Sequence, residues 1–266
     1  MTTSIAQRIA DQLAVPERQI SAAITLLDEG ATVPFISRYR KEVTGGLDDT
    51  QMRFLDERLR YLRELEDRRG VILKSVEEQG KLTPTLEAAL LQADTKNRLE
   101  DLYLPYKVKR RTKAQIAREA GLGPLAEALM ANPGLDPETE AAAYLNADAG
   151  ITDTKGALDG ARQILMEHFA EDADLLARLR QFLQDHALLA ARLVTGKEQE
   201  AAKFQDYFEH TEALARIPSH RALAMFRGRN EGVLNLSLTL PDQDGQSGVH
   251  PCEVMVREHW GIHDQG

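Results

Sequence analysis

The sequence concentrates positive charge between residues 107 and 113. Five cations fall within these seven residues, with no acidic residue among them: Lys107, Lys109, Arg110, Arg111 and Lys113. Such a cluster produces a local positive potential that attracts phosphate groups, which predicts contact with a nucleic-acid backbone. Thr112 is placed to cap a helix starting at Lys113, so backbone N–H groups and cations would face the same anion. The alternatives are a solvated loop at a corner of a helical bundle and a loop that docks on an acidic surface.

A second basic cluster surrounds Tyr39. Its cations are Arg38, Arg40 and Lys41. These groups can bind phosphates, while the Tyr39 ring offers a flat face on which a base can stack. The alternative is ordinary packing, in which Phe35, Ile36 and Tyr39 point into the core and the arginines pair with carboxylates such as Glu42.

A third group of basic residues follows residue 215. Its members are Arg216, His220, Arg221, Arg227 and Arg229. They form a lesser candidate patch, because Pro218 and Ser219 have the character of a helix start and the arginines can simply cover the surface of that helix.

The common catalytic motifs are absent from the sequence. It contains no phosphate-binding P-loop motif, no dinucleotide-binding glycine fingerprint after a strand and no HExxH zinc motif. His259 and His263 have the spacing of two metal ligands on one helix face, but Gly261 lies between them and no third ligand is evident. The acidic run from Glu171 to Asp174 is explained by a loop or a helix N-terminus. We therefore expect no enzyme, no metal and no cofactor.

The charge of the chain is unevenly distributed. The formal total of −9 argues at first against a polyanion as partner. Residues 1–130 carry a net charge of +1, however, whereas residues 131–215 carry −9. The first half can therefore contact nucleic acid locally, and the acidic middle third favours a protein partner.

Composition also limits the cellular setting. Cys252 is the only cysteine, which excludes an internal disulfide and a cysteine-rich zinc site. No apolar run approaches the roughly 20 residues that span a bilayer, and no secretory signal opens the chain. We expect a cytoplasmic protein without a membrane partner.

Apolar residues recur at helical spacing through most of the chain, which predicts a mainly α fold, a multi-helical bundle. Asp48 is a good N-cap for a long helix with a stripe of Met52, Leu55, Leu59, Leu62 and Leu65. A further helix is predicted from Val71. A helix-turn-helix-like unit is expected at about residues 82–132. Within it, Ile116 to Leu122 resembles the helix and tight turn of such a unit. The segment after the turn, Leu125 to Met130, offers few polar groups for contact with base edges.

The pattern changes near Ile217 and Pro218. Four leucines from Leu234 to Leu240 alternate with polar residues, the period of a half-buried strand. The polar run from Pro241 to Gly248 predicts a turn, and Cys252 to Arg257 the returning strand. We therefore divide the chain into a helical region, 1–217, and a short β-containing C-terminal segment, 218–266, with a β-hairpin.

Three blocks of this sequence resemble the bacterial Tex family of transcription accessory proteins. They are residues 31–48, ATVPFISRYRKEVTGGLD; residues 99–107, LEDLYLPYK, continuing into RRTK at 110–113; and residues 217–221, IPSHR, with Arg227 and Gly228. The blocks are long, ordered as in the family and spread over most of the chain.

The resemblance implies that the chain corresponds to the N-terminal helical region of a longer protein. It also implies further domains, among them an RNase H-like domain, a helix-hairpin-helix element and an oligonucleotide-binding-fold domain associated with RNA and DNA binding. A nucleic-acid-binding scaffold without catalysis is the implied role.

Two functional interpretations are favoured by the sequence over a third, an enzyme, which would need a cleft with convergent carboxylates. The first is a non-catalytic helical module that gives auxiliary phosphate-backbone contact to RNA or DNA, weak and sequence-tolerant. The second is a protein-interaction scaffold that docks on the transcription or translation machinery, with RNA polymerase or ribosome-associated proteins as partners.

Overall fold

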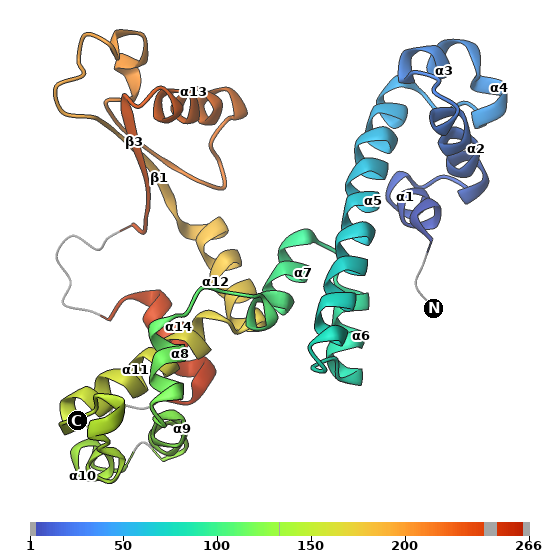
Figure 1. The fold of residues 1–266 in the computed structure, drawn as a ribbon. Helices are drawn as coiled ribbons and strands as arrows, with labels where there is room; N and C mark the ends of the chain where they lie inside the picture. The colour runs from blue at the N-terminus through green and yellow to red at the C-terminus, as the bar shows by residue number, and fades with distance from the viewer. Residues whose placement is uncertain (1–3, 133, 242–248, 263–266) are drawn as a thin grey trace. The chain divides into compact units, whose positions relative to one another are not determined.

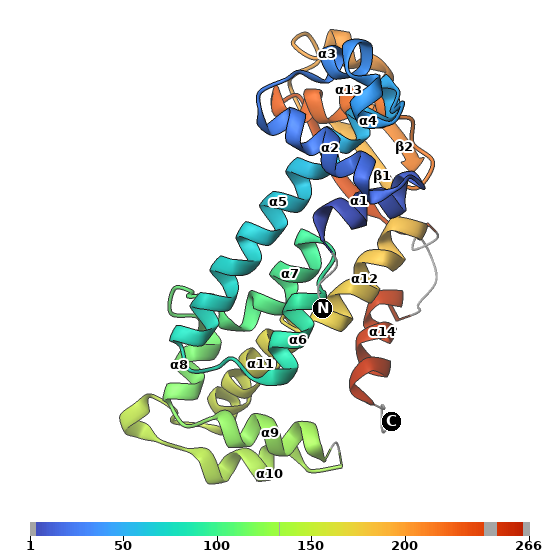
Figure 2. The ribbon, with the colours of Figure 1, turned by 90° about the vertical axis from the view of Figure 1, so that its right-hand side faces the viewer.

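The computed structural model describes residues 4–132, 134–241 and 249–262. These residues are mostly helical, with one small sheet, which confirms the predicted mainly α class (Figures 1 and 2). The chain forms two compact units, Met1–Val108 and Lys109–Gly266. Within the described ranges, none of the helices is both long and apolar enough to cross a bilayer.

The first unit is entirely helical in its described part. Helices α1 (Ile5–Leu13), α2 (Glu17–Asp28), α3 (Val33–Tyr39) and α4 (Lys41–Thr44) precede the long helix α5 (Asp49–Glu78). Helices α6 (Pro84–Gln92) and α7 (Lys96–Tyr103) and the 3-10 turn η1 (Leu104–Tyr106) follow. Helices α1, α2 and α3 all contact α5, so one core joins the short helices to the long one.

Helix α5 begins at the predicted N-cap. The Asp48 carboxylate accepts a hydrogen bond from the Gln51 N–H at 2.8 Å, and the Gln51 side chain accepts one from the Asp48 N–H at 3.0 Å. This reciprocal pair satisfies N–H groups that the helix itself cannot satisfy. All five residues of the predicted apolar stripe are buried, which confirms both the start of the helix and its core face.

The helix does not restart at Val71 as predicted but continues through Gly70 to Glu78. The buried side continues at helical spacing through Leu65, Arg69, Ile72 and Val76, so tertiary packing holds the helix across the glycine. A single glycine inside a helix costs only about 1 kcal/mol relative to alanine, which this packing offsets.

Arg69 is the charged member of that buried face and is only 4% exposed. Its Nε donates to the Leu90 carbonyl at 2.9 Å and its Nη2 to the Ala93 carbonyl. These carbonyls belong to the end of α6, where the last carbonyl groups have no partner within the helix. A third hydrogen bond joins Arg69 to Glu66, so the guanidinium caps α6 from within α5.

The helical part of the second unit is built on α11 (Thr154–Ala170). Helices α8 (Lys113–Glu119), α9 (Gly123–Ala131) and α10 (Pro137–Ala141) and the turns η2 (Ala142–Tyr144) and η3 (Ala147–Ala149) precede it. Helix α8 packs on α11 at Gly160, where an added Cβ would clash with Leu122 Cδ1 and would lie 3.3 Å from Ala117 Cβ. The glycine therefore allows a close approach of the segment that follows the basic residues.

The second half of this unit contains an antiparallel sheet. Helix α12 (Ala173–His186) leads into β1 (Leu188–Leu193), and η4 (Ala202–Tyr207), β2 (Glu209–Ala213), α13 (Ser219–Asn230) and β3 (Leu234–Thr239) follow. The strand order is β2-β1-β3, with Leu189 opposite both Glu212 and Leu238. The predicted division after residue 217 thus runs through a sheet that combines strands from both sides of it.

The strand predicted from Leu234 is present, but the predicted hairpin is wrong. Its partner is β1, and residues 251–260 form helix α14 (Pro251–Trp260). Pro251 stands in the first turn of that helix, and Trp260 packs at its end on His168 and Phe169, with ring centroids 4.7 and 5.3 Å away. These contacts favour a helix where a strand was expected. Apart from Pro241, the predicted turn at 241–248 lies outside the described residues.

We predict that Arg69→Met lowers the free energy of unfolding by about 2–4 kcal/mol, because the carbonyls at the end of α6 lose their donors while the side-chain volume is kept. Denaturation in urea, followed by circular dichroism, measures this loss. Trp260 is the only tryptophan in the chain and lies in the second unit. Its fluorescence therefore reports the unfolding of that unit, separately from the unit that contains Arg69.

Arg60→Met is the matched control on the same helix. Arg60 is exposed and pairs only with Asp56 within its own helix among the described residues, so a change below about 0.5 kcal/mol is expected. Equal unfolding midpoints for the two variants would contradict the role assigned to Arg69.

Candidate nucleic-acid interface

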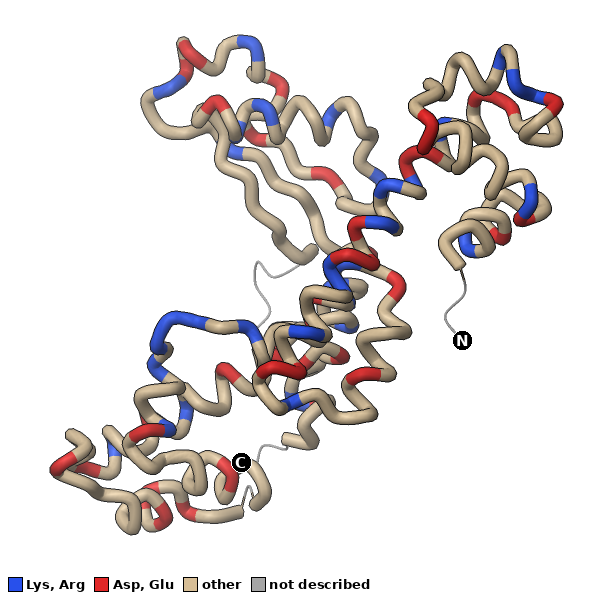
Figure 3. Tube along the Cα trace, turned by 45° about the vertical axis from the view of Figure 1, so that its right-hand side comes forward, with Lys and Arg blue, Asp and Glu red and all other residues tan. Residues whose placement is uncertain are grey.

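The predicted basic segment is a loop, residues 107–113, that runs from η1 to the first residue of α8. Its five cationic residues are all exposed, and Val108 between them is 86% exposed. Figure 3 shows this run as a nearly continuous stretch of positively charged residues along the chain trace. The loop is named the basic loop below.

Two carboxylates from α11 and its C-terminal cap hold one side of the basic loop. Lys109 forms an ion pair with Glu171, and the Thr112 hydroxyl donates a hydrogen bond to Glu167 at 2.9 Å. Both carboxylates are largely buried, with side chains 16% and 17% exposed. For Lys109, therefore, the alternative of a loop docked on an acidic surface is the one observed.

The start of α8 is capped as predicted. The Thr112 hydroxyl accepts a hydrogen bond from the Gln115 N–H at 3.0 Å while it donates to Glu167. Glu167 also receives a hydrogen bond from Arg118. A carboxylate of the protein itself thus lies beside the helix start that was expected to face a phosphate.

The electrostatics of Glu167 reflect these contacts. Burial alone would raise the pKa of its carboxyl group, but hydrogen bonds from Arg118 and Thr112, together with the charges of Arg118 and Lys109, hold that pKa below its ordinary value. The carboxylate therefore stays ionised and keeps the basic loop attached to α11 over the neutral pH range.

The remaining cations of the basic loop differ in their surroundings. Arg111 pairs with Glu119 at 3.0 Å, and Lys107 lies close enough to Glu100 to contribute to the lowered pKa of that carboxyl group, after the larger effect of Arg68. Arg110 and Lys113 have no hydrogen bond or ion pair with any residue that the structure describes. These two are the cations that remain available for an external phosphate.

Helices α8 and α9 flank a tight turn at Gly121, whose φ of +88° suits glycine. Helix α9 contains no lysine or arginine, and Leu125 and Ala126 on it are buried. The exposed charged group on the helix is Glu127. Base reading in a major groove depends on polar side chains, of which α9 carries only Glu127.

The second predicted cluster lies on α3 and α4. Ile36 is buried as the packing alternative requires, but Phe35 and Tyr39 are 43% and 66% exposed. The expectation that both rings point into the core is therefore wrong, because α3 has only one face against the core. Arg40 lies 5.9 Å from the Phe35 ring centre and 3.9 Å from Glu42.

In the third predicted group, several arginines are already engaged. Arg221 pairs with Glu212 at 3.1 Å and Arg227 with Glu231 at 2.9 Å, while the Arg229 guanidinium lies over the Phe226 ring. Helix α13 begins at Ser219, as the surface-helix alternative expects.

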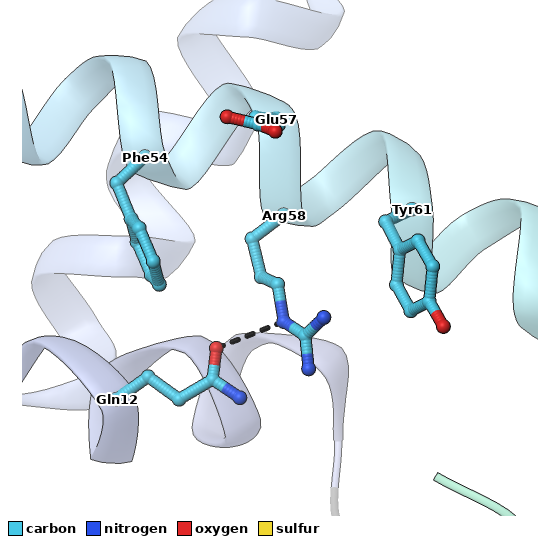
Figure 4. A pocket seen from close by; sticks show the side chains of 5 residues that line it. All are labelled: Gln12, Phe54, Glu57, Arg58 and Tyr61. Carbon is cyan, nitrogen blue, oxygen red and sulfur yellow. Dashed lines mark hydrogen bonds between the residues drawn. The ribbon is translucent and has the colours of Figure 1, made fainter. Parts of the chain in front are cut away.

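A groove between α1 and α5 was not found by the sequence reasoning. It has a volume of about 400 Å³ and is lined by Gln12, Phe54, Glu57, Arg58 and Tyr61. Figure 4 shows Arg58 between the two rings, with its Nε donating to Gln12 at 2.9 Å. The sequence feature that could have indicated the groove is the helical spacing of Phe54, Arg58 and Tyr61, which places them on one side of α5. Glu57 is the single carboxylate among the lining residues.

His259, a candidate metal ligand, and Asp172, from the acidic run, have partners within the fold. Asp172 caps α12 by accepting from the Leu175 N–H at 2.6 Å, and its carboxylate lies 3.3 Å from His259 Nε2. His263, the other proposed ligand, lies outside the described residues. Among the residues that are described, no three His, Cys, Asp or Glu side chains gather around one point.

Comparison with models of protein families matches both ends of the chain. Residues 3–77 match the Tex-like protein N-terminal domain, and residues 132–266 match the Tex central region-like family. The basic loop lies between the two matched segments.

Similarity to individual proteins extends over nearly the whole chain. Protein YhgF of Escherichia coli (strain K12) and the transcriptional accessory protein Tex of Neisseria gonorrhoeae are each 58% identical over 98% of this chain. The human S1 RNA-binding domain-containing protein 1 is 31% identical over 89% of it. The chain spans 34% of each bacterial protein and 24% of the human one, so about a third or less of their length.

The pKa of Glu167 leads to a pH-dependent prediction. Since its pKa in the folded protein lies below the ordinary value of 4.5, the ionised carboxylate stabilises the fold above that value, and the contribution is lost as the pH falls through the folded pKa. Glu167→Gln is therefore expected to lower the free energy of unfolding by about 1 kcal/mol at neutral pH. The difference from wild type should narrow as the pH drops below 4.5.

Urea denaturation at several pH values tests this, with Trp260 fluorescence reporting on the second unit. Glu127→Gln on α9 is the control, because this exposed carboxylate has no ion pair with the described residues. If the deficit of Glu167→Gln stays constant from neutral to acidic pH, the carboxylate does not hold the basic loop by its charge.

Proposed function

Because the chain belongs to the Tex family of transcription accessory proteins, we propose that it is a non-catalytic helical module whose basic loop makes an auxiliary contact with the phosphate backbone of RNA or DNA. The observation that carries the proposal is the state of Arg110 and Lys113. Both are exposed and have no carboxylate partner among the described residues, although the chain as a whole is acidic.

The geometry of the basic loop supports the proposal because part of it is already held in place. Lys109 and Thr112 attach it to Glu171 and Glu167, so Arg110 and Lys113 sit on a segment fixed at both of these points. Less conformational freedom is lost when such a segment binds a ligand than when a free loop does.

The proposed contact is weak and does not depend on sequence. Phosphate contacts position a protein on nucleic acid but carry no base information, and α9 offers few groups for base edges. The net charge of −9 opposes a polyanion at long range, so binding should be strongest at low salt and should fall steeply as salt is added.

The names of two relatives refer to transcription and to RNA binding. One is named a transcriptional accessory protein, and the human one is named for an S1 RNA-binding domain. This chain covers about a third of the bacterial relatives, and the proposal assigns it a supporting contact. Docking on RNA polymerase or ribosome-associated proteins through the acidic residues 131–215 is the competing proposal.

We predict that changing Arg110 and Lys113 together to glutamine weakens binding of the 266-residue chain to RNA and DNA about ten-fold at low salt. The logarithmic salt dependence should also become shallower, by about 0.7 per lost phosphate contact on single strands and about 0.9 on duplexes. Fluorescence anisotropy with labelled oligonucleotides between about 50 and 200 mM salt measures both quantities.

The matched control changes Lys155 and Arg162 to glutamine, which removes the same charge from exposed positions on α11 of the same unit. Its affinity and salt dependence should stay close to those of wild type. An equal loss in both double variants would show a general charge effect without a site. Wild-type protein that fails to bind at low salt would refute the proposal and favour the protein-docking alternative.

A further inference from the structure

Helices α3 and α4 carry a surface that combines aromatic rings with free cations. We define the α3–α4 patch as Phe35, Arg38, Tyr39, Arg40 and Lys41. The two rings lie 5.5 Å apart at an angle of 46° and are both well exposed. One exposed aromatic residue is unremarkable on a protein surface, but two in contact beside three cations form a distinct apolar and positive surface.

The rings do not serve the core of the first unit. Helix α3 presents Ile36 and Ser37 to the interior, both 5% exposed or less, and packs on α5 through that side. Phe35 and Tyr39 flank this side and lie toward solvent. Burial of α3 is thus complete without them, which leaves their faces available to a ligand.

The backbone beneath the patch is fixed. The Ser37 hydroxyl donates to the Val33 carbonyl at 2.9 Å, and Thr44 at the end of α4 is fully buried. Gly45 closes α4 with a φ of +64°, and its carbonyl accepts a hydrogen bond from Gln19 of α2 at 3.0 Å. A rigid surface loses little freedom when a ligand binds to it.

The cations of the patch are largely unneutralised. Arg38 and Lys41 form no ion pair with the described residues, and Arg40 has only the 3.9 Å contact with the exposed Glu42. Glu42 is the one acidic residue between positions 31 and 47. The surface is therefore complementary to a ligand with negative charges beside flat apolar groups.

We propose that the α3–α4 patch binds single-stranded nucleic acid, with an unpaired base stacked on Tyr39 and neighbouring phosphates held by Arg38 and Lys41. A single strand exposes base faces and phosphates together, whereas a duplex hides its base faces within the stack. The inference rests on the proposed nucleic-acid contact of the chain and adds to it a second site that selects single strands. Charge alone, as in the basic loop, gives no such selection.

Two substitutions at Tyr39 separate stacking from apolar docking of a protein segment. Tyr39→Phe keeps the flat ring, whereas Tyr39→Leu keeps a large apolar side chain without the ring. Stacking predicts near wild-type affinity for Tyr39→Phe and a loss of about five- to ten-fold for Tyr39→Leu, the lower part of the range found for base stacking on aromatic residues. An apolar contact predicts similar behaviour for the two variants.

The experiment titrates the 266-residue chain into a single-stranded oligonucleotide containing one 2-aminopurine, as RNA and as DNA, and into the matching duplex. Stacking on Tyr39 is expected to change the 2-aminopurine fluorescence of the single strands, and Tyr39→Leu should remove that change. Duplex affinity should be unaffected by either Tyr39 variant. Leu223→Ala, at an exposed apolar position of α13, controls for general loss of apolar surface.

The outcomes distinguish this inference from the contact proposed for the basic loop. If Tyr39→Leu binds single strands as wild type does while the variant of Arg110 and Lys113 is impaired, the α3–α4 patch proposal is overturned and the basic loop stands. If Tyr39→Leu weakens binding to single strands and the variant of Arg110 and Lys113 does not, the basic-loop proposal is overturned and the α3–α4 patch proposal stands. A wild-type chain that binds neither strand form overturns both proposals.

Discussion

The buried guanidinium of Arg69 is the interaction on which the first unit depends. An arginine side chain cannot give up its charge, so a position that is 4% exposed requires partners for its N–H groups. The Leu90 and Ala93 carbonyls supply them, which fixes the end of α6 against the middle of α5. Helix α7 then starts where the Lys96 N–H meets the Tyr61 hydroxyl, 3.0 Å away. These two contacts together attach the end of α6 and the start of α7 to α5.

Sequence patterns predicted the elements whose stabilisation is local. Asp48 and the leucine stripe of α5 follow from capping chemistry and helical spacing, and both are present. Strand β1 could not be predicted in the same way, because its sequence LLAARL does not alternate. Leu189, Ala190 and Ala191 are all buried, as expected for the central strand between two others. Because β1 was not predicted, the strand from Leu234 was paired with residues 252–257 as a hairpin, whereas its partner in the structure is β1.

The candidate site shows the same division between local and distant causes. Composition located the basic loop, but Lys109 is neutralised by Glu171, 62 residues further along the chain, and Thr112 bonds to Glu167, 55 residues further along. Tyr39 was identified from its type and neighbours, whereas its exposure depends on which side of the seven-residue α3 meets α5. In a helix of two turns, spacing does not decide between Phe35 and Ile36 as the residue that faces the core.

Pairing within the protein also explains how an acidic chain can present positive sites. Carboxylates at Glu167 and Glu171 neutralise part of the basic segment and fix its backbone, and the unpartnered Arg110 and Lys113 then project from a held loop. On α3 and α4 the same result arises differently, since Glu42 is the only acid nearby in sequence. Local potential at short range depends on such arrangements more than on total charge, because salt screens charges beyond about 8–10 Å. A net charge of −9 is thus compatible with short-range recognition of phosphate.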